Sequence, residues 1–93
     1  MATLTVRLPR MLSAFADGKL EFEVEGETLA GALDALTTRY PALAVHLFDE
    51  HRRLRGHVLC FHNDDNTRWL PSLDRPVKSG DVITIMQAVT GGG

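Results

Sequence analysis

The stretch VITIMQAVTGGG, residues 82–93, contains the two features on which the fold and the function depend. Residues 82–86 are apolar or β-branched and carry no charge, which predicts a central strand covered on both faces of a sheet. Residues 91–93 are three consecutive glycines, which lose much conformational freedom on ordering and bury no side chain. A firmly held strand therefore runs into a segment that is either slack or functional.

Two alternating segments near the N-terminus predict a pair of neighbouring strands. Apolar and polar residues alternate over residues 3–8 (TLTVRL), and Pro9 ends the run. The alternation is stricter over residues 19–26 (KLEFEVEG), where Leu20, Phe22 and Val24 share one side. A turn signature at Asp17-Gly18 lies between them. We expect a hairpin-like pair that is joined by a loop instead of a tight turn.

The middle of the chain changes to a helical period. Leu29, Leu33, Leu36 and Tyr40 recur at helical spacing, starting at residue 27 or 28, and a proline at position 41 ends the helix. Residues 42–50 predict a short second helix and residues 51–56 a loop. Beyond them we expect a short buried strand at 57–61, a turn at 62–68, a brief edge strand at 68–70 and a loop at 72–81.

This element order predicts the α+β class. It favours one mixed sheet of four to five strands, with one main helix packed across one face. The 93 residues allow a single domain, and the hydrophobic share of 44% and charged share of 24% are those of a soluble globular protein. The net charge of −2 and the scattered basic residues exclude a nucleic-acid binder and suit a basic protein partner.

The single cysteine, Cys60, argues for a reducing compartment. No apolar run approaches the length of a membrane span, and the first ten residues do not form a signal peptide. We therefore expect a cytoplasmic protein that does not act at a membrane.

A terminal carboxylate is a weak electrophile that reacts only after activation, for example as an acyl-adenylate. The activating enzyme must admit the tail into a narrow cleft and approach its backbone closely. Glycine permits this approach because it has no Cβ. Three glycines after a rigid strand are suited to presenting a carboxylate.

Three pieces of the sequence together resemble the ubiquitin-like sulfur carriers of the ThiS/MoaD type, and among them the CysO-like carriers. The most specific piece is SGDVITIMQAVTGGG at residues 79–93. The others are NDDNTRWL at 63–70 and GETLAGALDAL at 26–36, and the likeness covers nearly all of the chain.

The resemblance implies a β-grasp (ubiquitin-like) domain over residues 1–90 and a flexible glycine tail over 91–93. It implies a protein cosubstrate, not an enzyme, which is a monomer when free and binds no cofactor or metal. A ubiquitin-activating-type enzyme would use ATP and Mg to adenylate the tail, a sulfur source would convert it to a thiocarboxylate, and an acceptor enzyme would take the sulfur.

The same resemblance suggests which residues act. The thiocarboxylate would form at Gly93, or at Gly92 if the last residue is trimmed, because relatives typically end in two glycines and this chain has three. The chain also has Gln87 where the family often has proline, which weakens the rigidity just before the tail. The expected partner contacts are Met86, Ala88, Val89, Thr90, Gly91 and Gly92.

Other reactive residue types favour structural roles. Cys60 is expected in the core, and the four histidines (His46, His51, His57 and His62) match no zinc pattern. The acidic run at 62–66 lacks the glycine and distant glutamate of a calcium loop, so it predicts a turn. Basic side chains are expected to form salt contacts at the rim of the docking surface: Arg68, Arg75 and Lys78. No catalytic dyad or triad is evident.

Three other functions stay open on the sequence alone. The chain would serve equally as a ubiquitin-like modifier conjugated to lysines, as the small subunit of molybdopterin synthase, or as a plain interaction module with a slack tail. For the sulfur carrier, the resemblance favours cysteine synthesis, while thiamin, molybdopterin and a sulfur-containing secondary metabolite remain alternative products.

Overall fold

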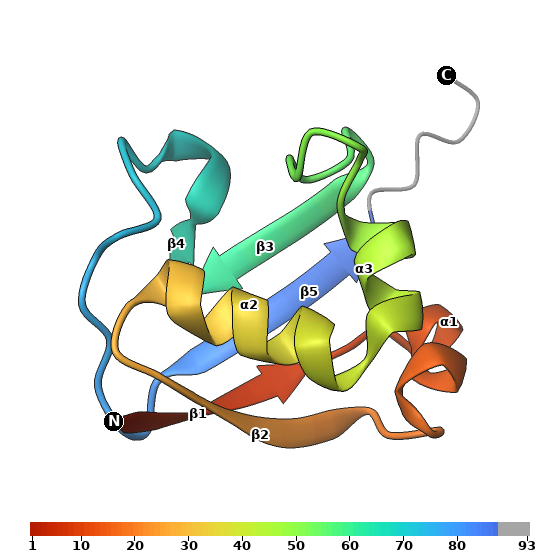
Figure 1. The fold of residues 1–93 in the computed structure, drawn as a ribbon, viewed down its shortest axis with the longest axis horizontal. Helices are drawn as coiled ribbons and strands as arrows, with labels where there is room; N and C mark the ends of the chain where they lie inside the picture. The colour runs from red at the N-terminus through yellow and green to blue at the C-terminus, as the bar shows by residue number, and fades with distance from the viewer. Residues whose placement is uncertain (88–93) are drawn as a thin grey trace.

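The computed structural model describes residues 1–87, and residues 88–93 lie outside the described part. Five strands form one mixed sheet (Figure 1) in the order β2-β1-β5-β3-β4. Their bounds are β1 (Ala2–Arg7), β2 (Glu21–Gly26), β3 (Val58–His62), β4 (Asp65–Asn66) and β5 (Val82–Gln87). Strand β1 pairs antiparallel with β2 and parallel with β5, while β5 pairs antiparallel with β3. The strand nearest the C-terminus therefore lies in the middle of the sheet, as expected.

Two helices cross one face of the sheet (Figure 1), namely α2 (Leu29–Arg39) and α3 (Pro41–Leu47). Thr28 caps α2, because its Oγ1 accepts a hydrogen bond of 3.0 Å from the Gly31 N–H. Pro41 occupies the first turn of α3, where its missing N–H costs nothing. These bounds confirm the predicted main helix and the predicted second helix.

The core lies between this pair of helices and the sheet. Alternate residues of every long strand point into it, and α2 and α3 contribute their apolar stripes. The fully buried large side chains are Leu4, Val6, Leu12, Leu29, Leu36, Leu43, Leu47, Val58, Cys60, Ile83 and Ile85. Ile83 and Ile85 place β5 directly under the helices and thereby fix its position.

The structure corrects two predictions about burial. Strand β5 is covered on one face only, since Val82 and Thr84 are half-buried and Met86 is 47% exposed on the other side. The helices α2 and α3 lie on one face of the sheet (Figure 1), so the prediction of burial on both faces was wrong. Leu20 shares the parity of Phe22 and Val24 but is 47% exposed, because it precedes the strand and lies beyond the helices' cover.

Two connections also differ from the prediction. The edge strand is β4 at Asp65–Asn66, whereas residues 68–70 belong to a 3-10 turn, Thr67–Trp69, and its end. The turn forms because the Asn66 side chain accepts the Arg68 N–H at 2.9 Å, so that N–H is not available to a strand. The loop between β1 and β2 contains a short helix, α1 (Arg10–Ser13), and a second 3-10 turn, Ala14–Ala16.

Arginine side chains cover carbonyl groups near both edges of the sheet. Arg39 donates to the Glu23 carbonyl at 3.0 Å, and its guanidinium lies over the rings of Phe22 and Tyr40. Arg68 donates to the carbonyls of Gly56 (3.2 Å) and Val58 (3.5 Å) beside β3. Such contacts hinder pairing of an exposed edge with another chain.

A mixed five-stranded sheet with its main helix across one face is the β-grasp architecture that the resemblance implies. Within residues 1–87, none of the helices has the length and apolar character needed to cross a bilayer.

Candidate functional site

The end of β5 is the last described point before the glycine tail, and it is paired with β3. Gln87 pairs with Val58 of β3, and further back Thr84 pairs with Arg7 of β1. Ile85, between them, is 2% exposed in the core. Residues that follow Gln87 along the chain therefore start from a paired strand rather than from a free loop.

The beginning of β5 is held by a network around the Asp81 carboxylate. Its Oδ2 lies 2.8 Å from Nε2 of His62 and accepts the Lys78 N–H at 2.9 Å, while its Oδ1 accepts from the Asn63 amide at 3.3 Å. Asn63 completes the link, since its Oδ1 accepts the Val82 N–H at 2.9 Å. The turn after β3 is thereby tied to the first residue of β5.

Hydrogen bonding stabilises the ionised form of Asp81. The Lys78 N–H contributes most and the His62 side chain next, and together they lower the pKa of Asp81 to about 2. The other ring nitrogen of His62, Nδ1, is buried and has no hydrogen-bond partner within the described residues. This histidine thus serves as a structural contact near the start of β5.

A cluster of apolar side chains lies on the side of the sheet that the helices leave uncovered, which we call the open face. Met86 of β5 is opposite Leu59 of β3 in the register, and Phe61 lies two residues further along β3. Leu59 and Phe61 are half-buried and Met86 is 47% exposed. Met86 and Leu59 are directly paired, and Phe61, which is opposite Thr84, is a diagonal neighbour of Met86 within reach of its long side chain. These three residues therefore form one apolar cluster next to the end of β5.

The site residues predicted from the sequence fall into two groups. Met86 lies in the apolar cluster, with Leu59 and Phe61 as neighbours that the sequence reasoning did not single out. Alternation within residues 58–62 was the available signal, but pairing with Met86 depends on the register of β3 against β5. The remaining predicted residues, Ala88, Val89, Thr90, Gly91, Gly92 and Gly93, lie outside the described residues, so their roles stay predictions.

Cys60 is a core residue, as predicted. It is 1% exposed, and burial raises the pKa of its thiol to about 11, with a smaller opposing effect of the Thr67 hydroxyl. A protonated, buried thiol is a poor nucleophile.

The basic residues of the predicted rim behave differently from one another. Arg75 forms an ion pair within the chain, with Asp65 at 3.0 Å, and its predicted contact with a partner stays a prediction. Arg68 instead binds backbone carbonyls, and the side chain of Lys78 forms no ion pair within residues 1–87. The same residues hold no cluster of three or more metal-ligating side chains.

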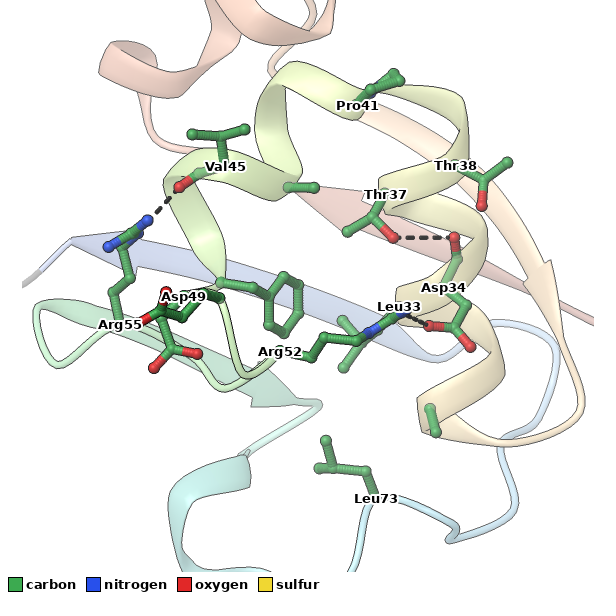
Figure 2. A pocket seen from close by; sticks show the side chains of 14 residues that line it. Leu33, Asp34, Thr37, Thr38, Pro41, Val45, Asp49, Arg52, Arg55 and Leu73 are labelled. Carbon is green, nitrogen blue, oxygen red and sulfur yellow. Dashed lines mark hydrogen bonds and ion pairs between the residues drawn. The ribbon is translucent and has the colours of Figure 1, made fainter.

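A cavity of about 700 Å³ lies on the helical side of the molecule, away from the open face. Leu33, Val45 and Leu73 are among the side chains that line it, and Arg52 reaches toward Asp34 near its rim (Figure 2). The Arg52–Asp34 pair measures 2.8 Å, and Arg55 donates to the Val45 carbonyl at 2.9 Å. Both arginines at this cavity thus already have partners within the chain. The cavity is separate from the base of the tail.

The sequence profile of the ThiS family matches residues 6–92. The sulfur carrier protein CysO of Mycobacterium tuberculosis is 29% identical over 91 residues, which cover 96% of this chain and 98% of that protein. A chain of the crystal structure of the Amycolatopsis orientalis BexX/CysO complex is 30% identical, with a TM-score of 0.82 and coverage of 96% of this chain and 99% of that one.

The solution structure of the small archaeal modifier protein 1 from Methanosarcina acetivorans is also similar. It is 35% identical, with a TM-score of 0.79 and coverage of 99% of this chain and 98% of that one. The profile match includes the central strand β5 and the first two of the three glycines. The chain described here therefore belongs to the ThiS family.

Proposed function

We propose that the protein is a sulfur carrier whose terminal glycine carboxylate becomes a thiocarboxylate. The observation that carries the proposal is the position of β5, which lies in the middle of the sheet and stays paired through Gln87, six residues before the end of the given sequence. The three glycines at 91–93 then follow a held base. The match to the ThiS family and the similarity to proteins named CysO support the same function.

The proposed chemistry takes place in two steps on a partner enzyme. A carboxylate oxygen of the terminal glycine attacks the α-phosphorus of ATP, and pyrophosphate leaves with the Mg ion. A sulfide sulfur then attacks the carbonyl carbon of the acyl-adenylate, and AMP leaves. The product is a thiocarboxylate, and the carrier supplies the reacting carboxylate while the partner supplies the catalytic groups.

The carboxyl carbon that reacts belongs to Gly93 if the chain is used as it stands, or to Gly92 after removal of one residue. The family profile matches as far as residue 92, which supports a reaction at the second glycine after trimming. The partner contacts proposed for Ala88, Val89, Thr90 and Gly91 follow from the same placement of the tail in the enzyme's cleft.

The acceptor that we favour is an enzyme of cysteine synthesis, working in the cytoplasm, because relatives of this chain are named sulfur carrier protein CysO. A complex of BexX with CysO exists among the similar structures, which supports docking of a carrier on a second protein. Thiamin and molybdopterin synthesis use the same tail chemistry and are the alternative destinations.

The test is the intact mass of the protein after incubation with the adenylating enzyme of the same genome, ATP and sulfide. We expect a gain equal to the exchange of one oxygen for one sulfur, localised to the C-terminal peptide. A variant that lacks Gly92 and Gly93 keeps the domain and is expected to show no gain. A second carrier protein that makes the same enzyme release pyrophosphate shows that the enzyme is active. If the mass of the full chain stays unchanged with that active enzyme, the proposal is wrong.

A second function, modification of proteins, is favoured by the 35% identity to small archaeal modifier protein 1. In that reaction a lysine amine attacks the activated carbonyl and forms an isopeptide bond. The test is mass spectrometry of lysine peptides from cells that express the tagged chain. Peptides that carry its C-terminal residues would establish this function, and their absence alongside a thiocarboxylate would exclude it under those conditions.

A further inference from the structure

The cavity between α2, α3 and the loop of residues 48–55 combines an apolar wall with a charged rim. Its volume of about 700 Å³ lies within the range of small-molecule sites in proteins. Leu33 of α2, Val45 of α3 and Leu73 are among the apolar side chains of the wall (Figure 2). Val45 is 65% exposed although it is a large aliphatic side chain. A ligand with an apolar body would cover this surface.

One ion pair spans the rim of the cavity. Arg52 extends from the loop to Asp34 of α2, and the charged groups of the two side chains lie 2.8 Å apart (Figure 2). Both side chains are largely exposed to solvent. Because an ion pair in water stabilises a protein little, this contact opens at low cost.

The backbone at Arg52 is unusual for an arginine. Its φ is 61°, in the left-handed region. Asp17 and Asn63 also have a positive φ, but they are of residue types that tolerate this region, whereas arginine seldom adopts it. The loop is held in this shape by Asp49, whose Oδ1 accepts the N–H groups of the residues on either side of Arg52, at 2.8 Å and 3.0 Å. Backbone strain of this kind occurs at ligand clamps.

The charges around the cavity favour a positively charged ligand. Three carboxylates and two guanidinium groups line it, which gives a net charge of −1: Asp34, Asp49, Glu50, Arg52 and Arg55. Arg55 is held in place, because it donates to the Val45 carbonyl at 2.9 Å. Arg52 can withdraw, because it has a long side chain on a loop, whereas Asp34 is short and fixed on α2. Once Arg52 turns into water, the net charge of the lining becomes −2.

We propose that this cavity binds a small organic ammonium ion with an apolar body. The Arg52 guanidinium occupies the position beside Asp34 that the ammonium group takes in the complex, so Arg52 is a competitor built into the chain. An anion fits less well, because the Asp34 carboxylate cannot withdraw and stays beside it. The proposal does not depend on the sulfur carrier function, since the cavity is separate from the base of the tail.

Three probes that share one apolar body test the preference for charge. They are 4-phenylbutylamine, 4-phenylbutanol and 4-phenylbutyrate, which are positive, neutral and negative at neutral pH. Each is titrated into the full chain, labelled with nitrogen-15, at about 50 mM salt. The amide signals of Thr37, Thr38 and Phe48 report binding in the cavity. We expect a Kd on the order of 1 mM for the amine, binding about tenfold weaker for the alcohol, and the weakest binding for the carboxylate.

Two substitutions then distinguish a ligand site from an ion pair that only supports the loop. Asp34→Asn removes the anchor of the ammonium group and is expected to weaken binding of the amine by about tenfold. Arg52→Gln removes the competitor and is expected to strengthen binding by about threefold. If the pair only maintained the shape of the cavity, both substitutions would weaken binding.

The matched controls break another exposed ion pair. Arg7 and Glu21 lie 3.1 Å apart on β1 and β2, and neither lines the cavity. Arg7→Gln and Glu21→Gln change the net charge as the two test variants do, and both are expected to keep the wild-type Kd for the amine. The spectrum of each variant also shows whether the domain is folded, so a loss of structure is not mistaken for a loss of binding.

Three results would overturn the proposal. The first is that the alcohol or the carboxylate binds as tightly as the amine, and the second is that no probe shifts the signals of the cavity residues. The third is that Asp34→Asn and Arg52→Gln fail to act in opposite directions. None of these results bears on the sulfur carrier chemistry, which the mass measurement tests separately.

Discussion

His62 and Asp81 are 19 residues apart, and their side chains lie 2.8 Å from one another at the start of the strand that leads to the glycine tail. Asp81 also accepts the Lys78 N–H, and neighbouring Val82 is bonded to Asn63. The Asp81 carboxylate and the Asn63 side-chain amide together join the turn after β3 to the first residue of β5. The position of the tail's base depends on this contact as well as on the core.

The Asp81 network predicts a specific dependence of stability on pH. Its pKa falls from 3.8 to about 2 on folding, so the carboxylate contributes stability that is complete above about pH 4 and is lost as the pH falls toward 2. The contribution is on the order of 2 kcal/mol. Asp81→Asn should lower the free energy of unfolding at pH 7 and flatten its pH dependence in this window, as measured by urea unfolding. An equal pH profile for wild type and variant would contradict the assignment, and Asp64→Asn serves as the control.

Two glycines five residues apart in the sequence, Gly26 and Gly31, should respond oppositely to substitution by alanine. A Cβ at Gly26 would lie 2.7 Å from the Ala32 backbone nitrogen, so Gly26→Ala forces β2 away from α2 and should cost about 1–3 kcal/mol. At Gly31 the nearest atom is Thr28 Oγ1 at 3.4 Å, an ordinary contact. Because alanine favours a helix, Gly31→Ala should be neutral or should stabilise by up to about 1 kcal/mol. Thermal unfolding of both variants tests the close packing of β2 against α2. Equal changes in stability for the two variants would contradict this packing.

The apolar cluster predicts a residue that affects docking but not folding. Met86→Asp places a charge in the apolar cluster and should raise KM for adenylation by about thirtyfold, the effect of losing an interface hot spot of about 2 kcal/mol. Its free energy of unfolding should change little, because the side chain is 47% exposed. Met11→Asp is the matched control, since Met11 is 64% exposed on α1. If both variants are adenylated like the wild type, Met86 is not a partner contact.

Cys60 should be unreactive in the folded protein. Burial raises the pKa of its thiol to about 11, so almost no thiolate is present at pH 8. We expect iodoacetamide to label the protein only in denaturant, with the mass of one adduct, and we expect Cys60→Ala to retain sulfur transfer. Rapid labelling without denaturant would show instead that the thiol is accessible to partners.

Local sequence patterns were sufficient to predict the type and position of most of the helices and strands. The helical spacing of Leu29, Leu33 and Leu36 and the cap at Thr28 identified α2, because a helix buries one stripe and satisfies its first N–H groups locally. The alternation of Phe22 and Val24 identified β2 for the corresponding reason. The uncharged composition of residues 82–86 correctly indicated the central strand, and the buried run around Cys60 correctly indicated a core position.

What the sequence by itself determined is therefore the type of each main element, the buried side of α2, β1 and β2, and the glycine segment that follows the last strand. Only the tertiary structure decided which elements meet, as in the pairing of Met86 with Leu59 and the contact of His62 with Asp81. The reason is physical. Periodicity is imposed by the local backbone, whereas strand order and register are chosen by the packing of segments far apart in the chain, which no single segment encodes.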